Sequence, residues 1–167
     1  MQGANSHIAY YNTYITKTVT DDEAYDEPLE SAAYREAYLQ TLFKYAYPHV
    51  PEVYSVQRKT ITMQRVTESV SLEKYLMLNP YRVSRSLLLE KVETIIKALS
   101  KSRILHRDVT YENILVDVKE NLWLIDFGRA RKYQENDDLE EMEDWDRDIF
   151  VDTLGDLIDS GLAKLTP

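Results

Sequence analysis

The amino-acid sequence predicts an α+β fold, and two observations support that prediction. Segments rich in β-branched and aromatic residues are concentrated in the first part of the chain, whereas segments of good helix formers dominate the rest. The two kinds of segment show little of the strand–helix–strand alternation that builds doubly wound sheets. We therefore expect a small β-sheet followed by a mainly helical region.

The first part of the chain predicts one hairpin, one helix and two further strands. The hairpin covers residues 7–19 and turns at Asn12, because β-branched and aromatic residues flank this position on both sides. Residues 29–45 consist mainly of helix formers, which predicts a helix. Two β-rich segments, 52–57 and 59–66, predict the remaining strands.

The second part of the chain predicts three helices and another hairpin. Residues 71–76 make a short helical segment, and residues 81–102 make a long amphipathic one. Residues 113–127 place two apolar runs on either side of a polar turn, which is the pattern of a hairpin. We expect a last helix over residues 148–165.

Composition limits the class of protein. The chain has 167 residues and no cysteine, so we expect one domain or two small lobes that share a core, without disulfides or cysteine-bound zinc. No apolar run approaches the roughly 18 residues that a membrane helix needs, and the first residues lack the features of a signal peptide. A cytoplasmic or nuclear protein that makes no membrane contact is the expectation.

The net charge of −9 is concentrated in one acidic segment. Residues 135–148 contain nine acidic residues and one arginine, and such blocks are commonly solvated or disordered. A chain with this negative net charge is a poor candidate for binding the phosphates of a nucleic acid. We therefore expect no direct binding of nucleic acid.

Three polar side chains near the second hairpin predict a site for a metal and a phosphate. If the hairpin turn centres on residues 119–120, Asn113 and Asp126 lie opposite each other, with Cβ atoms about 5 Å apart. An amide oxygen and a carboxylate are ligands of the kind that Mg²⁺ takes. Asp108 lies close enough in sequence to reach the same end of the hairpin, where a further carboxylate suits a general base or a group that positions a nucleophile.

Glu36 provides an independent clue. On the predicted helix it shares a face with Ala33 and Leu39, and a carboxylate on an apolar face requires a cationic partner. Lys17 is the only lysine in the preceding strand pair. Helical spacing alone also allows the alternative that both side chains are simply exposed.

Two segments carry a resemblance to a known family. The sequences "HRDVTYEN" at 106–113 and "DFG" at 126–128 resemble the catalytic loop and the metal-binding motif of eukaryotic-type protein kinases, in the same order and at a similar spacing. Residues 34–56 resemble the kinase helix αC and the strand after it. The segment from Ile61 resembles the fifth kinase strand and the hinge, and the segment from Asp148 resembles the helix αF.

The resemblance implies a bilobal protein kinase-like fold. The N-terminal lobe would cover residues 1–66, with a small sheet and an αC-like helix at 29–45. Residues 67–167 would form a shortened helical C-terminal lobe that ends near αF and contains the catalytic loop 106–113 and the DFG motif 126–128. Asp148, the first residue of the αF-like segment, would hold the backbone of the catalytic loop.

The resemblance also implies a role for individual residues. Lys17 would contact the α- and β-phosphates of ATP and pair with Glu36, and Asp108 would accept or orient the proton of a substrate hydroxyl. Asn113 and Asp126 would hold Mg²⁺.

Further members of the implied site are structural or contact the nucleotide. His106 and Arg107 would be structural or regulatory members of the catalytic loop. Met63 would be the gatekeeper at the back of the nucleotide site, and the hinge that follows would run from Gln64 to Val66.

Three departures separate the chain from conventional protein kinases. A glycine-rich loop is absent, because the only glycines are Gly3, which would at most end a vestigial loop, and Gly128, Gly155 and Gly161. Thr110 stands where Ser/Thr kinases usually have a lysine that touches the γ-phosphate. No Ala-Pro-Glu motif follows DFG, and the helices that usually form a peptide-docking platform are missing.

These departures make the chain similar to the minimal, atypical branch of the superfamily. That branch includes the RIO kinases, the small kinase of the KEOPS complex and the lipopolysaccharide sugar kinases. The implied function is ATP- and Mg²⁺-dependent transfer of the γ-phosphate to a hydroxyl of a protein or small molecule, or ATP hydrolysis within a complex. The alternative is a pseudokinase that binds nucleotide or acts as a scaffold for a protein partner.

Two further expectations concern the C-terminal region. The acidic segment 135–148 would replace a phosphate on the activation loop, placing Glu140, Glu141 and Glu143 near Arg107; it could also select a basic substrate or partner. A truncated lower lobe would expose apolar residues of the αF-like helix and so favour a protein partner or self-association there. The expected exposed residues are Ile149, Phe150, Leu154, Leu157 and Ile158.

Overall fold

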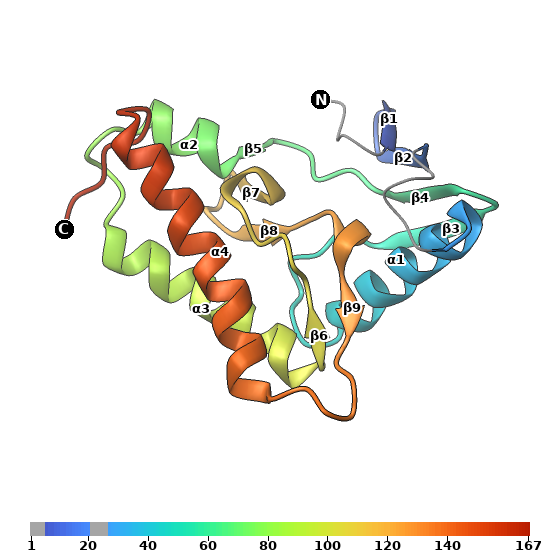
Figure 1. Cartoon of the computed structure of the whole chain (residues 1–167). Helices are drawn as coiled ribbons and strands as arrows, with labels where there is room; N and C mark the ends of the chain where they lie inside the picture. Colours follow the sequence, from blue (N-terminus) through green and yellow to red (C-terminus); the bar gives the residue numbers. More distant parts are fainter. Residues whose placement is uncertain (1–5, 21–26) are drawn as a thin grey trace.

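The computed structural model describes residues 6–20 and 27–167 and confirms the α+β fold. A four-stranded antiparallel sheet and one helix form one side of the molecule, and helices dominate the other side (Figure 1). Gly3, the candidate for a vestigial glycine loop, lies outside the described residues. None of the described helices is both long and apolar enough to cross a membrane.

The predicted strands of the first part are all present in the sheet. Strands β1 (Ser6–Tyr10) and β2 (Tyr14–Val19) form the first hairpin, whose turn is closed by the Tyr11 amide donating to the Tyr14 carbonyl at 2.9 Å. Strands β3 (Val53–Gln57) and β4 (Thr60–Gln64) complete the sheet in the order β1-β2-β4-β3.

Helix α1 (Leu29–Lys44) forms where the sequence predicts it and packs on two neighbours. Ala33 and Ala37 are buried in a small hydrophobic cluster with residues of β2 and β4. Leu39 and Phe43 belong to the large core shared with the second part of the chain. The helix therefore packs both on the sheet and on the region that contains the catalytic-loop sequence.

The second part of the chain combines short strands with three helices. Its elements are β5 (Ser69–Ser71), α2 (Leu72–Leu78), α3 (Arg85–Lys101), β6 (Ile104–Leu105), the 3₁₀ turn Tyr111–Asn113, β7 (Ile114–Asp117), β8 (Leu122–Leu124), the 3₁₀ turn Phe127–Arg129, β9 (Arg131–Lys132) and α4 (Leu139–Asp159). The predicted hairpin is formed by β7 and β8, and β6 pairs with β9. The lobe boundary between residues 66 and 67 stays a prediction.

Helix α4 begins well before its predicted start at residue 148. The Asp138 carboxylate accepts hydrogen bonds from the backbone amides of Glu140 and Glu141 and so caps the N-terminus. Acidic residues in the first turn also interact favourably with the positive end of the helix dipole. Most of the acidic segment is therefore helical rather than disordered, whereas most of its acidic side chains are exposed, so the solvated alternative is confirmed.

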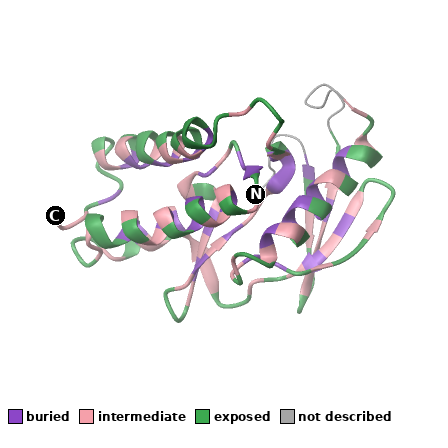
Figure 2. Cartoon of the chain, turned by 90° about the horizontal axis from the view of Figure 1, so that it is seen from below, coloured by how far each residue is buried: buried purple, intermediate pink, exposed green. Residues whose placement is uncertain are grey.

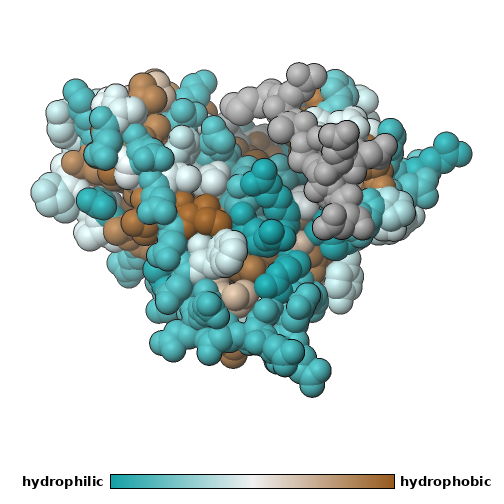
Figure 3. Space-filling view, viewed as in Figure 1, coloured by the Kyte–Doolittle hydropathy of each residue, from teal (hydrophilic) through white to brown (hydrophobic). Residues whose placement is uncertain are grey.

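The prediction that α4 exposes an apolar face is also wrong. Phe150, Leu154 and Leu157 are buried, and Ile149 and Ile158 are partly buried, because α3 packs along this side of the helix. Buried and exposed residues alternate along the long helices in Figure 2, as expected for amphipathic packing. The face of the molecule shown in Figure 3 is mainly hydrophilic, with separate hydrophobic areas.

Candidate active site

Lys17 and Glu36 form the predicted ion pair. Lys17 lies on β2 and Glu36 on the inward face of α1, and their side chains meet with a distance of 2.8 Å between Nζ and Oε1. Both side chains are buried, with only 6% and 1% of their surface exposed. The alternative that both are exposed is therefore wrong.

The same ammonium group also contacts Asp126. The distance from Lys17 Nζ to Asp126 Oδ1 is 2.6 Å, and the Gly128 amide donates to the same oxygen at 3.2 Å. Burial acts to lower the pKa of Lys17, but the carboxylates of Glu36 and Asp126 more than offset this and hold the pKa well above its usual range. Burial acts to raise the pKa of Asp126, and Lys17 reverses that effect, so this carboxyl is ionised at neutral pH.

Asp108 and Asn113 are joined inside the loop 106–113. The Asn113 amide nitrogen donates to the Asp108 carbonyl at 3.0 Å and to the Asp108 carboxylate at 2.9 Å. Burial raises the pKa of Asp108, although the nearby Arg129 guanidinium partly opposes the shift. The negative charge of Asp126 also raises this pKa.

The register of the β7–β8 hairpin differs by one residue from the prediction. Ile114 pairs with Leu124, so Ile125 rather than Asp126 comes opposite Asn113, and the Ile125 amide donates to the Asn113 carbonyl at 3.0 Å. The cause lies in the turn, because the Asp117 carboxylate accepts hydrogen bonds from the amides of residues 119 and 121.

Asn113 and Asp126 each keep a side-chain oxygen of the kind that Mg²⁺ takes as a ligand. Asn113 Oδ1 and Asp126 Oδ2 accept no hydrogen bond from the described residues, so each side chain keeps one oxygen available. No group of three or more histidine, cysteine, aspartate or glutamate residues within 6–20 and 27–167 is arranged to hold a metal. Mg²⁺ commonly uses only one or two protein ligands and takes the rest from water and substrate phosphates, so the chemistry of these two side chains agrees with the predicted magnesium site.

A cavity of about 270 Å³ lies between the sheet and the second part of the chain. All six residues predicted to bind the nucleotide line it, namely Lys17, Glu36, Met63, Gln64, Val66 and Asp126. Asp108 and Asn113 are not among its lining residues. The contacts between these side chains are observed, whereas their roles toward ATP and Mg²⁺ remain predictions.

The residue that holds the catalytic-loop backbone is Asp146, not Asp148 as predicted. Asp146 Oδ2 accepts from the His106 amide at 2.9 Å, and Oδ1 accepts from the Arg107 amide at 2.7 Å. Arg107 has a φ of 67°, a strained conformation for a residue with a side chain, and these bonds help to fix it. Asp148 is exposed because two residues rotate a helix by about 200°.

Helical periodicity could have identified Asp146. Met142, Asp146, Phe150 and Leu154 recur every four residues and are all buried on α4, so a helix starting earlier places Asp146 on the inward stripe. Burial raises the pKa of Asp146 to about 6, although the amides of His106 and Arg107 act in the opposite direction.

His106 is a fully buried packing residue. Its ring makes an edge-to-face contact with Phe127 at a centroid distance of 4.8 Å, and Phe127 contacts Phe43 of α1 at 5.7 Å. Burial lowers the pKa of His106 to about 4, so the ring is neutral at physiological pH. This stack connects α1, the DFG segment and the catalytic loop through apolar contacts.

Arg35 is a contributor that the sequence interpretation missed. It lies next to Glu36 on α1 and donates to the backbone carbonyls of Gly128 and Ala130, immediately after the DFG sequence, and to the Glu27 carboxylate. No sequence pattern could have indicated carbonyl partners more than 90 residues away in the chain. The contacts fix the segment that follows Asp126 against α1.

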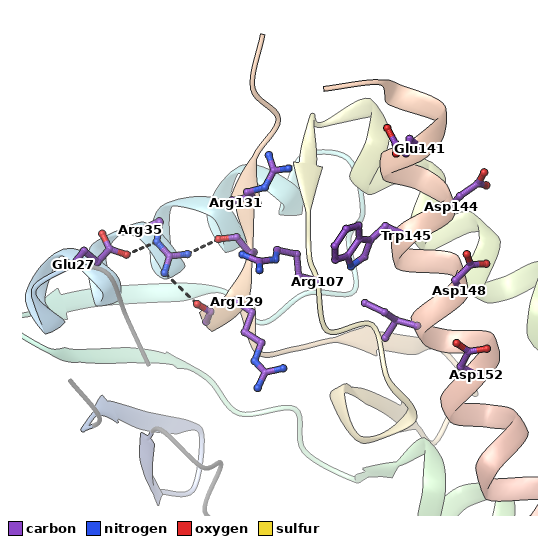
Figure 4. Close-up of a pocket in the computed structure, with 13 residues that line it drawn as sticks. Glu27, Arg35, Arg107, Arg129, Arg131, Glu141, Asp144, Trp145, Asp148 and Asp152 are labelled. Atoms are coloured by element: carbon purple, nitrogen blue, oxygen red, sulfur yellow. Dashed lines mark hydrogen bonds and ion pairs between the residues drawn. The ribbon is translucent and has the colours of Figure 1, made fainter. Parts of the chain in front are cut away.

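A larger groove, with a volume of about 1010 Å³, lies on the α4 side of this segment. Figure 4 shows arginines on one side of the groove and acidic residues with Trp145 along α4 on the other. Within the described residues Arg107 makes no ion pair, and Glu140, Glu141 and Glu143 do not contact it; instead Arg131 pairs with Asp137. The expected contact between Arg107 and these glutamates is therefore absent.

Comparison with known families agrees with this arrangement. Residues 5–146, most of the chain, match the family described as protein kinase domain. The chain belongs to the protein kinase domain family. A search of curated proteins found no match.

We predict that Asp146→Asn will destabilise the protein by about 1–3 kcal/mol, because the new amide nitrogen faces a buried backbone donor that loses its acceptor. Asp148→Asn on the same helix is the matched control and should change stability little. Urea unfolding gives the free energies, and hydrogen exchange should show faster exchange of the His106 and Arg107 amides in Asp146→Asn alone. Equal behaviour of the two variants would contradict the assignment.

The raised pKa of Asp146 predicts a dependence of stability on pH. A carboxyl whose pKa is higher in the folded state binds a proton more tightly there, so its contribution to stability falls as pH rises from the unfolded value toward about 6. The stability advantage of the native chain over Asp146→Asn should therefore be larger at pH 5 than at pH 7, when both are unfolded in urea. An advantage that shrinks on acidification would show that this carboxyl is not shifted upward.

Proposed function

We propose that this protein is a minimal, atypical kinase that transfers the γ-phosphate of ATP to a hydroxyl group of a protein or a small molecule. The observation that carries the proposal is the contact of Lys17 with both Glu36 and Asp126 at the wall of a cavity. A structural ion pair would need one carboxylate, whereas a second carboxylate with a free oxygen suits a site that also receives a cation and phosphates.

Each residue has a role in the proposed reaction. Lys17 binds the α- and β-phosphates, and Glu36 keeps its ammonium group in place. Asn113 and Asp126 hold Mg²⁺, which neutralises charge on the phosphates when it is bound. Met63 and the hinge from Gln64 to Val66 surround the base of the nucleotide.

Asp108 acts at the acceptor. Its carboxylate takes the proton from the acceptor hydroxyl as the hydroxyl oxygen forms a bond to the γ-phosphorus, and the bond from that phosphorus to the bridging oxygen of ADP breaks. The raised pKa of Asp108 supports this assignment, since a weaker acid is a stronger base. The groove beside α4 is open to the acceptor and adjoins Asp108 through Arg129.

Assignment to the atypical branch rests on a feature of conventional kinases, the glycine-rich turn, that the described residues lack. Residues 6–20 and 27–66 contain no glycine, so no glycine-rich turn covers the phosphates in this part of the structure. Hydrolysis of ATP within a complex is the same chemistry with water as the acceptor.

A pseudokinase is the second candidate, and the missing glycine-rich turn favours it. Backbone amides of such a turn normally hold the phosphates, and their loss weakens nucleotide binding. In that case the contacts of Lys17 with Glu36 and Asp126 have a structural role. The chain then acts as a nucleotide-binding or scaffold module for a protein partner.

The deciding test is release and transfer of phosphate from ATP with Mg²⁺, comparing the native chain with Asp108→Ala and Asp126→Ala. Both variants should lose at least about 100-fold in turnover, because each removes a group that acts in the transition state. Glu90→Ala, an exposed carboxylate on α3, is the control and should keep full activity. The acceptors offered should include a basic protein and a panel of sugars.

If the native chain binds ATP without turnover, the pseudokinase becomes the better assignment. Turnover that survives Asp108→Ala would place the chemistry elsewhere in the molecule.

A further inference from the structure

Arg129 follows the DFG sequence directly and lies beside Asp108. Its Nη1 is 3.7 Å from Asp108 Oδ1, a loose contact, and 66% of the side-chain surface is exposed. The backbone around it is fixed, because Arg35 binds the carbonyls of Gly128 and Ala130 on either side. Arg129 therefore combines a rigid attachment point with a side chain that is free to move.

Phosphoryl transfer next to Asp108 requires positive charge, because negative charge spreads over the oxygens of the transferred group in the transition state. Two cations influence the pKa of Asp108, namely Arg129 and Lys17. Lys17 is held at 2.8 Å and 2.6 Å by its two carboxylate partners. Thr110, within the catalytic loop, is neutral.

Arg107 does not serve this purpose in the structure. Its side chain lines the groove beside α4, whereas that of Arg129 extends in a different direction (Figure 4). Among the described residues, Arg129 is thus the cation near Asp108 whose hydrogen-bond donors are largely uncommitted: the 3.7 Å approach to Asp108 is its one ion pair there, and no side-chain hydrogen bond is formed.

We propose that Arg129 is a catalytic residue that binds the γ-phosphate of ATP during transfer, a role that rests on the proposed kinase function. The planar guanidinium group presents paired N–H donors that match two phosphate oxygens. When a phosphate is present, Arg129 exchanges its loose contact with Asp108 for the phosphate, and the carboxylate becomes free to accept the hydroxyl proton. The side chain supplies the charge that Thr110 cannot.

The test compares ATP and ADP binding by the native chain, Arg129→Ala and Arg129→Lys, together with turnover. Arg129→Ala should weaken ATP binding roughly tenfold and leave ADP binding nearly unchanged, because only ATP carries the phosphate that Arg129 contacts. Its kcat should fall at least about tenfold. Arg129→Lys keeps the positive charge but lacks the paired N–H donors of the guanidinium group. Its ATP affinity and kcat should therefore lie between those of the native chain and Arg129→Ala.

Arg85→Ala, an exposed arginine at the start of α3, is the matched control and should match the native chain in both measurements. Equal affinities of native and Arg129→Ala for ATP, or equal losses for ATP and ADP, would overturn the proposal. Higher turnover in Arg129→Ala would also overturn it, by showing that Arg129 restrains Asp108. A native chain that binds neither nucleotide would instead contradict the kinase function itself.

Discussion

The structure depends on one buried ammonium group between two carboxylates. Lys17 comes from the sheet, Glu36 from α1 and Asp126 from the segment after β8, so a single cluster joins three parts of the chain that are distant in sequence. Removing one member of a buried ion cluster leaves uncompensated charge and commonly costs about 3–5 kcal/mol. The sheet, α1 and the DFG segment are therefore held in one arrangement.

Helix α4 supports the same site from the other side. Its inward stripe is apolar except for Asp146, which holds the backbone of the catalytic loop, while its outward side carries acidic residues that are well solvated. A helix whose outer face is acidic can face water directly. One helix thus both anchors the loop that bears Asp108 and forms one wall of the groove beside it.

Local patterns in the sequence predicted much of this arrangement. The strands, α1, α3 and the β7–β8 hairpin follow from periodicity and propensity, and Glu36 was identified because a carboxylate on an apolar helix face needs a cation. The hairpin register was missed by one residue because the Asp117 side chain sets the turn. The prediction that Asp148 holds the loop backbone is wrong because the helix expected from residue 148 begins at Leu139, which puts Asp146 on its buried stripe. Contacts such as those of Arg35 depend on tertiary packing and cannot be predicted from the local sequence.

The most direct test of the central cluster is a double-mutant cycle on the free energy of unfolding, with Lys17→Met, Glu36→Gln and the two combined. Lys17→Met alone leaves two carboxylates without their cation, whereas the double variant leaves one, so the combined loss should be smaller than the sum of the single losses. We expect a coupling of about 1 kcal/mol or more. Losses that simply add would contradict the account, because they would show that Lys17 and Glu36 do not stabilise each other in the folded protein.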